Sequence, residues 1–221
     1  MLIANARMRS RVDLAGAARA TARCAGILCL LAGFAGCGGT SQVQVDRQVV
    51  QLTQPAEWVV AVFPLDDSAT KGTTEEYTVY GRTNAQGSGA MFARSISRAV
   101  GASGRFRSID DTALRNLMLD EKLTAAEFSA LDDRRAGELG RKLGANLVVR
   151  GKVVEFEKSW LLFMPKTTVR LELRGLDPAT GETIWSAVIG VTSTSRSEAA
   201  LISSIADDAL HAIAEGVGAP L

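Results

Sequence analysis

Histidine and cysteine are scarce in this sequence of 221 residues. His211 is its one histidine, and its three cysteines, Cys24, Cys29 and Cys37, all lie near the N-terminus. Zinc sites are built from Cys, His and acidic ligands, and a Ser-His-Asp triad needs a histidine as its base. We expect His211 to lie on the solvent side of a final helix. The sequence therefore argues against a zinc site and a His-based triad, and an enzyme of another type is the least favoured class of function.

An apolar run long enough to cross a bilayer is missing from the N-terminal region. The run at residues 25–32 is far shorter than the roughly 20 residues that a transmembrane helix needs. It follows five arginines between Arg7 and Arg23 and precedes the small residues Ala35 and Gly36. This order is the layout of a secretory signal peptide. We expect residues 1–36 to be removed on export, and Met8 is an alternative start.

The residues at the predicted cleavage point, Phe34-Ala35-Gly36-Cys37, resemble the lipobox of bacterial lipoproteins. The resemblance implies that the Cys37 thiol receives a diacylglycerol, that the chain is cut before Cys37, and that the new amine is acylated. Phe34 stands where leucine is usual, and the alternative is an ordinary signal peptide with a chance cysteine. Several acyl chains, at about 0.8 kcal/mol per CH₂, would hold the protein firmly to a membrane. Gly38, in place of Asp, implies sorting to the periplasmic face of the outer membrane.

Basic and acidic side chains are nearly equal in number. The net charge is +1, and without residues 1–36 the chain has 20 basic and 23 acidic side chains, a net of −3. No basic stripe remains, which argues against a nucleic-acid partner. Without Cys24 and Cys29, and with Cys37 modified, no disulfide can form, yet about 185 residues are ample for one domain. We expect a lipidated tether at 37–56, part of which can pair as an edge strand, and one domain at 57–221.

Periodicity predicts the elements of this domain. An apolar run ended by Pro64 predicts a buried strand at 58–63, and residues 64–86 are expected to form a long loop. Apolar residues three and four apart predict helices, and alternation predicts further strands, one of which places Val153 and Phe156 on opposite faces. The helices are expected at 88–100, 111–118, 132–143 and 197–217, and the further strands at 106–109, 147–156, 167–176 and 183–191. The order is β-α-β-α-α-β-β-β-α, an α+β single mixed-sheet sandwich with helices covering one face. Gly144 and Gly151 are expected to end a helix and to allow close approach in a strand.

Five segments, taken together, resemble the CsgG-related group of bacterial lipoproteins. They are Val60 to Leu65, Gly89 to Arg107, Leu114 to Leu119, Ala136 to Val153, and Asp177 to Trp185. This group includes the curli secretion channel protein and the LpoB activator of peptidoglycan synthases, and its domain resembles the N-terminal domain of TolB. The resemblance implies a non-enzymatic module in envelope secretion or surface assembly, with an envelope protein or a second copy as partner. The alternative is an LpoB-like activator of a peptidoglycan synthase.

The connection between the strands at 147–156 and 167–176 is short and apolar. Each membrane-crossing strand of a barrel needs roughly 9–11 residues, which residues 158–166 do not provide, so a pore is disfavoured. The apolar residues of this connection lie between Lys158 and Lys166 and are Trp160, Leu161, Leu162, Phe163 and Met164. Either this hairpin folds onto its own core, or its tip contacts a membrane or a partner protein.

Two further patterns are weaker candidates for ligand sites. Asp66-Asp67 and Glu75-Glu76 could bind a cation, although solvated loop acids are the simpler interpretation. Gly87-Ser88-Gly89 opens a helix at which a phosphate could bind. No Walker lysine or dinucleotide spacing follows, so an ordinary helix start is preferred. We therefore expect no cofactor and no metal, and the single modification that we predict is the lipid on Cys37.

Overall fold

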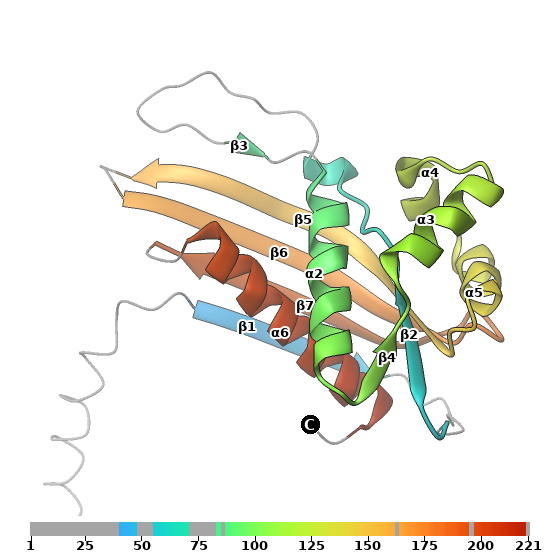
Figure 1. Cartoon of the computed structure of the whole chain (residues 1–221). Coiled ribbons are helices and arrows are strands. Elements are labelled where there is room, and N and C mark those ends of the chain that lie inside the picture. The colour runs from blue at the N-terminus through green and yellow to red at the C-terminus, as the bar shows by residue number, and fades with distance from the viewer. Residues whose placement is uncertain are drawn as a thin grey trace, which may run out of the picture. The chain divides into compact units, whose positions relative to one another are not determined.

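The computed structural model describes residues 40–47, 55–70, 83–84, 87–161, 164–194 and 197–219; at 40, 83, 84, 160, 161, 164 and 165 it describes the backbone alone. The described strands form one mixed sheet with the order β1-β7-β6-β5-β2-β4, and β3 pairs with β5 outside this path. The strands are β1 (Thr40–Arg47), β2 (Trp58–Val62), β3 (Thr83–Asn84), β4 (Phe106–Ser108), β5 (Leu147–Leu161), β6 (Met164–Leu176) and β7 (Thr183–Ser193). The helices are α2 (Ser88–Ala102), α3 (Asp111–Asp120), α4 (Ala125–Ser129), α5 (Asp133–Lys142) and α6 (Glu198–Val217), with a 3-10 turn, η2 (Ser68–Thr70). The predicted α+β fold is confirmed (Figure 1).

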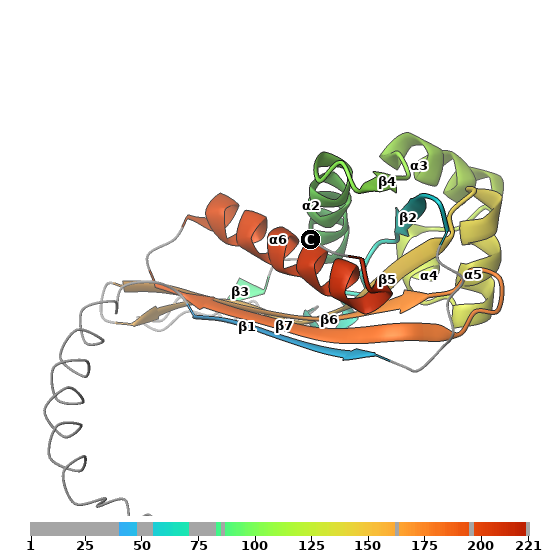
Figure 2. The ribbon, with the colours of Figure 1, turned by 90° about the horizontal axis from the view of Figure 1, so that it is seen from below.

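Strands β5, β6 and β7 form an antiparallel meander, to which β1 adds an antiparallel edge. Strand β2 lies parallel to both β4 and β5, so the sheet is mixed. In β6, the alternating residues Val169, Leu171 and Leu173 are buried, which agrees with a strand that has one solvent-facing side. Helices α2 and α6 lie over one face of the sheet, and among the described elements none covers the other face of β1, β7 and β6 (Figure 2).

A β-bulge interrupts the alternation of β5 and corrects one prediction. The pairing with β6 shifts between Val153 and Glu155, so Val154 is the extra residue on the β5 side. An extra residue returns the next side chain to the earlier face. Phe156 therefore lies in the same apolar cluster as Val153, not on the opposite face, and its ring meets that of Phe92 edge-on at 5.5 Å.

The apolar side chains form two cores on opposite faces of β2. Val60 and Val62 pack against α2 and α6, in what we call the α2–α6 core. Ala61 and Phe63 point the other way, into a smaller α3–α5 core beneath α3, α4 and α5. The rings of Phe63 and Phe128 meet there at an angle of 59°, with their centroids 4.6 Å apart. Fully burying one such side chain stabilises the fold by about 1.5–3 kcal/mol.

Local signals begin and end α6 at the predicted residues. The Ser197 hydroxyl accepts a hydrogen bond from the Ala200 amide at the start of α6, and Gly218 ends that helix in a left-handed conformation with φ of 71°. Gly144 follows α5 with φ of 74°. At Gly151 a Cβ atom would lie 2.0 Å from the Glu172 carbonyl oxygen, so this strand position admits glycine alone. Within the described part of the chain, none of the helices has the length and apolar composition needed to span a bilayer.

Candidate functional site

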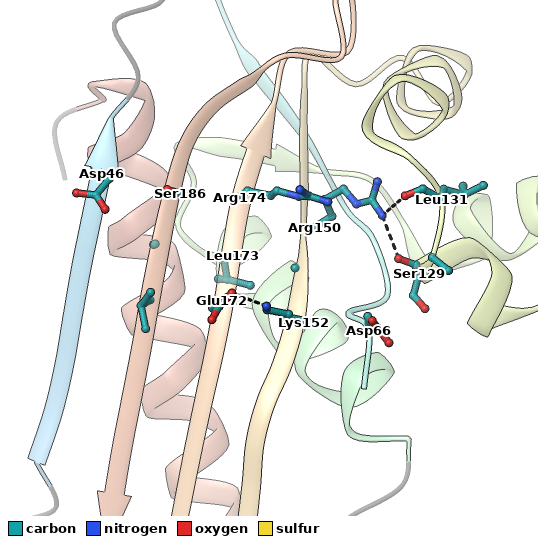
Figure 3. Close-up of a pocket in the computed structure, with 14 residues that line it drawn as sticks. Asp46, Asp66, Ser129, Leu131, Arg150, Lys152, Glu172, Leu173, Arg174 and Ser186 are labelled. Carbon is teal, nitrogen blue, oxygen red and sulfur yellow. Dashed lines mark hydrogen bonds and ion pairs between the residues drawn. The ribbon is translucent and has the colours of Figure 1, made fainter. Parts of the chain in front are cut away.

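A polar pocket of about 490 Å³ opens on the sheet face that helices α2 and α6 leave uncovered (Figure 3). Its floor is formed by outward-facing residues of β5, β6 and β7, and the connection between α4 and α5 forms one wall. The lining residues are Asp46, Asp66, Ser129, Ala130, Leu131, Arg150, Gly151, Lys152, Glu172, Leu173, Arg174, Ser186, Ala187 and Val188.

Arg150 lies at the back of this pocket and is 5% exposed. Its guanidinium donates to Asp133 Oδ1 at 3.0 Å, to the Ser129 carbonyl oxygen at 3.0 Å, and to the Leu131 carbonyl oxygen. Burial, and then the nearby charge of Arg174, lowers the pKa of Arg150, and Asp133 opposes this effect. The guanidinium thus ties the α4–α5 connection to the sheet, and its hydrogen-bonding capacity is directed at the protein itself.

Two ion pairs and a backbone hydrogen bond involve most of the remaining charged groups of the pocket. Lys152 Nζ lies 2.9 Å from Glu172 Oε2 on β6, and Arg174 lies 2.8 Å from Asp133 Oδ1. Asp66 Oδ1 accepts a hydrogen bond from the Ser68 amide at 2.9 Å. Both pairs are partly solvent-exposed, and exposed pairs exchange partners at little cost. The pocket can therefore bind a polar or charged surface by replacing these contacts.

The described residues show no metal-binding cluster at this pocket. They contain no group of three or more His, Cys, Asp or Glu that could hold a metal ion. The pocket lining includes no His or Cys, and its most buried ionisable group, Arg150, is an arginine that donates its hydrogen bonds to the protein.

The acids suggested as cation ligands take part in local structure where they are described. The backbone of Asp66 pairs with β5, since its amide donates to the Gly151 oxygen at 2.9 Å and its oxygen accepts from the Val153 amide at 2.7 Å. Asp67 Oδ2 accepts from the Gly89 amide at 3.5 Å. Glu75-Glu76 lies outside the described residues.

The other candidates also have local roles. His211 is exposed, as expected, and its Nδ1 lies 2.8 Å from the Asp207 carbonyl oxygen. At the start of α2, Ser88 is 1% exposed, and a Cβ atom at Gly89 would lie 2.0 Å from the Leu65 oxygen. The chain itself therefore covers this helix start, which leaves no room for a phosphate.

Two predicted sites lie outside what the structure describes. Cys37 precedes the first described residue. The apolar tip is described by the backbone of Trp160, Leu161 and Met164 alone, and Leu162 and Phe163 lie outside the described residues. Lipidation of Cys37 and the contact made by this tip stay predictions.

Sequence patterns missed the pocket because it joins distant segments. Alternation predicts Glu172 and Arg174 on the outward face of their strand and places Arg150 and Lys152 on a shared face of theirs, and all four line the pocket. The covering segment around Ser129 carries no periodic signal that would place it over Arg150. Arg150 is buried because the α4–α5 connection covers it, and this contact between distant segments exists only in the folded structure.

No protein-family model matches the chain, and no curated protein matches it in sequence. Solved structures similar to it include a dodecamer of a PelC variant from Paraburkholderia phytofirmans, with 17% identity, 82% of this chain and 99% of that chain covered, and a TM-score of 0.50. The match to lipoprotein GNA1162 from Neisseria meningitidis covers 72% of this chain and 99% of that chain, with 17% identity and a TM-score of 0.48. The match to the LpoB C-terminal domain from Escherichia coli covers 61% of this chain and 81% of that chain, with 17% identity and a TM-score of 0.36. The domain described above shares its fold with PelC.

Proposed function

We propose that this protein is a membrane-anchored envelope lipoprotein that acts as a non-enzymatic assembly or interaction module. The lipobox-like residues Phe34 to Cys37 support the anchor. The chemistry of the described pocket, in which paired charges surround a structural arginine, supports binding over catalysis. Sorting to the outer membrane, with the domain on its periplasmic face, is part of the proposal.

The observation that carries the proposal is where β1 begins. Thr40, the first residue of β1, follows Cys37 by three residues, which can span at most about 11 Å in any conformation. Thr40 pairs with Thr192 of β7, which pairs with Thr168 of β6, which in turn pairs with Glu157 of β5. A lipid on Cys37 would therefore hold the sheet by the end at which the β5–β6 hairpin closes (Figure 1).

The β5–β6 hairpin extends beyond the paired residues Glu157 and Thr168 toward its closed end, which lies on the same side of the sheet as Thr40. Four more residue pairs follow, from Lys158↔Thr167 to Leu161↔Met164. At about 3.4 Å per residue, the hairpin extends roughly 13 Å beyond the level of Thr40. This length matches the reach of the chain from Cys37, so an anchored protein would bring the apolar tip to the membrane surface. We propose that residues Trp160 to Met164 enter the interface, with Lys158 and Lys166 at the headgroups.

Vesicle flotation tests the anchor and the tip separately. Lipidated full-length protein should float with vesicles of phosphatidylethanolamine and phosphatidylglycerol, and Cys37→Ala should reduce the floated fraction strongly. Adding Trp160→Ser and Phe163→Ser to Cys37→Ala should remove the residual binding, whereas Leu119→Ser, at an exposed apolar residue on α3, should not. Unchanged flotation of Cys37→Ala would contradict the anchor, and equal residual binding of the tip and Leu119 variants would contradict the membrane contact.

We further propose that the anchored domain assembles with copies of itself in envelope secretion or surface assembly. The support is the fold shared with PelC, which forms a dodecamer. Anchors on one membrane require all copies to face the same way, so any ring would have its axis along the membrane normal. Native mass spectrometry of the detergent-extracted protein should give one closed oligomer. A monomer that co-purifies with a peptidoglycan synthase would instead support the LpoB-like activator role.

A further inference from the structure

A groove of about 570 Å³ lies between α2 and α3, away from both the polar pocket and the β5–β6 hairpin. It opens where β2 and β4 end. After β2 the chain continues to α2, which packs in the α2–α6 core. After β4 it continues to α3, which packs in the α3–α5 core. The lining residues are Val62, Pro64, Ala90, Ala93, Arg94, Ser97, Arg98, Ser108, Ile109, Asp110, Asp111, Leu114, Arg115, Met118 and Ala125.

This position is a topological switch point of the sheet. Strands β2 and β4 are parallel neighbours, and the helices that follow them cover opposite faces of β2. Connections that diverge in this way leave a crevice at the carboxyl ends of the strands, which is where open α/β sheets bind their ligands. Its volume lies within the range of about 300–1,000 Å³ that is typical of binding sites.

The floor of the groove is apolar and incompletely covered. Ile109, Leu114 and Met118 are half-buried against the α3–α5 core. Leu119 follows them on α3, four residues after Arg115, and is 75% exposed. Among the described residues it is the most exposed large apolar side chain, and it follows the lining residue Met118 without itself lining the groove.

The wall formed by α2 is cationic. Arg94 and Arg98 stand one turn apart on the exposed face of α2, and neither has an ion-pair partner among the residues that the structure describes. The α3 side carries opposite charge, where Asp111 pairs with Arg115 at 2.5 Å and Asp110 stands exposed at the helix start. The unpaired positive charge of the groove is therefore concentrated on α2.

We propose that this groove binds a segment of a partner protein that carries apolar side chains with Asp or Glu beside them. The apolar side chains would cover Leu114, Met118 and Leu119, and the carboxylates would face Arg94 and Arg98. The occupant is inferred from charge complementarity, because Arg94 and Arg98 are exposed on the groove wall without an ion-pair partner among the described residues. The inference rests on the proposed role as an interaction module, and not on the lipid anchor.

Photo-crosslinking in the native cell envelope identifies the occupant. With p-benzoylphenylalanine at Leu119, or at Met118, the full-length lipidated protein should give one main adduct, whose contact peptide is mapped by mass spectrometry. The proposal expects a peptide from another protein, with apolar residues and at least one Asp or Glu. A contact peptide from a second copy, a lipid adduct, a peptide without acids, or no adduct beyond that of a control label at Arg170 would each overturn it.

The mapped peptide then serves as the probe for the charge requirement. Arg94→Glu with Arg98→Glu should weaken its binding to the purified protein about tenfold, because two attractive charge contacts become repulsive. The matched control reverses Arg107 and Arg170, which are also exposed and without an ion-pair partner among the described residues. Asp110→Lys should leave binding unchanged or strengthen it. Equal losses in the two double variants would overturn the proposal, whereas flotation of the same proteins reports on the anchor independently.

Discussion

Replacing Arg150 with methionine tests whether its guanidinium holds the α4–α5 connection on the sheet. Methionine keeps the unbranched stem that packs along β5 but removes the donors to Asp133, Ser129 and Leu131. Arg150 is 5% exposed, so these partners lose a contact that water cannot fully replace. Asp133 keeps its contact with Arg174 at 2.8 Å and is not left unpaired.

The expected loss of stability depends on the number of hydrogen bonds that are lost and on the removal of a buried positive charge. Net contributions of hydrogen bonds to charged groups are about 1.5–3 kcal/mol each, so the three together contribute roughly 4.5–9 kcal/mol. Removing a buried cation recovers several kcal/mol of desolvation free energy. We expect Arg150→Met to lower the free energy of unfolding by about 3 kcal/mol. For a domain of this size, that lowers Tm by about 6–12 °C.

The assay is thermal unfolding followed by circular dichroism, with Arg174→Met as the matched control. The Arg174 side chain is 42% exposed, so losing its contact with Asp133 should cost less than about 1 kcal/mol. Hydrogen exchange should also accelerate at residues 128–133 in Arg150→Met and not in Arg174→Met. Equal Tm changes in the two variants, or a change below about 2 °C for Arg150→Met, would refute this reasoning.

Two further predictions concern the sheet and the pH dependence of stability. Gly151→Ala places a Cβ atom 2.0 Å from the Glu172 oxygen and should cost more than about 2 kcal/mol, whereas Gly190→Ala, with open space around it, should cost less than about 1 kcal/mol in the same denaturant titration. The hydrogen bond from Lys142 lowers the pKa of Glu121 below its ordinary value of 4.5. Its stabilisation is therefore complete above pH 4.5 and lost as pH falls through the folded-state pKa. The Tm difference between wild type and Glu121→Gln should shrink toward pH 3, and a constant difference would contradict this assignment.

The predicted elements followed from signals that act within one segment. Apolar spacing located α2, α5 and α6, and Ser197 and Gly218 marked the ends of α6 because capping depends on residues within one turn. Alternation in β6 gave its buried face because one side of that strand meets solvent. These signals also gave the α+β fold and the order of the longer elements from β2 onward, but not the short elements η2, β3 and α4.

The features that sequence patterns missed depend on partners far along the chain. The bulge at Val154 is set by pairing with β6, which the alternation of β5 alone does not reveal. The polar pocket needs the Ser129 carbonyl oxygen placed over Arg150, 21 residues later in the chain. The groove between α2 and α3 arises because the two helices follow parallel neighbours and cover opposite faces of β2. Periodicity within a segment carries no information about these arrangements.

The mass of the mature N-terminal peptide tests the anchor most directly. Protein extracted from cell membranes would be digested, and the N-terminal peptide would be measured by mass spectrometry. Our account predicts a peptide that begins at Cys37 and carries a diacylglycerol on its sulfur and an acyl chain on its amine. A free Cys37 thiol, or a mature terminus at another residue, would contradict the account, because β1 would then no longer start three residues after a lipid.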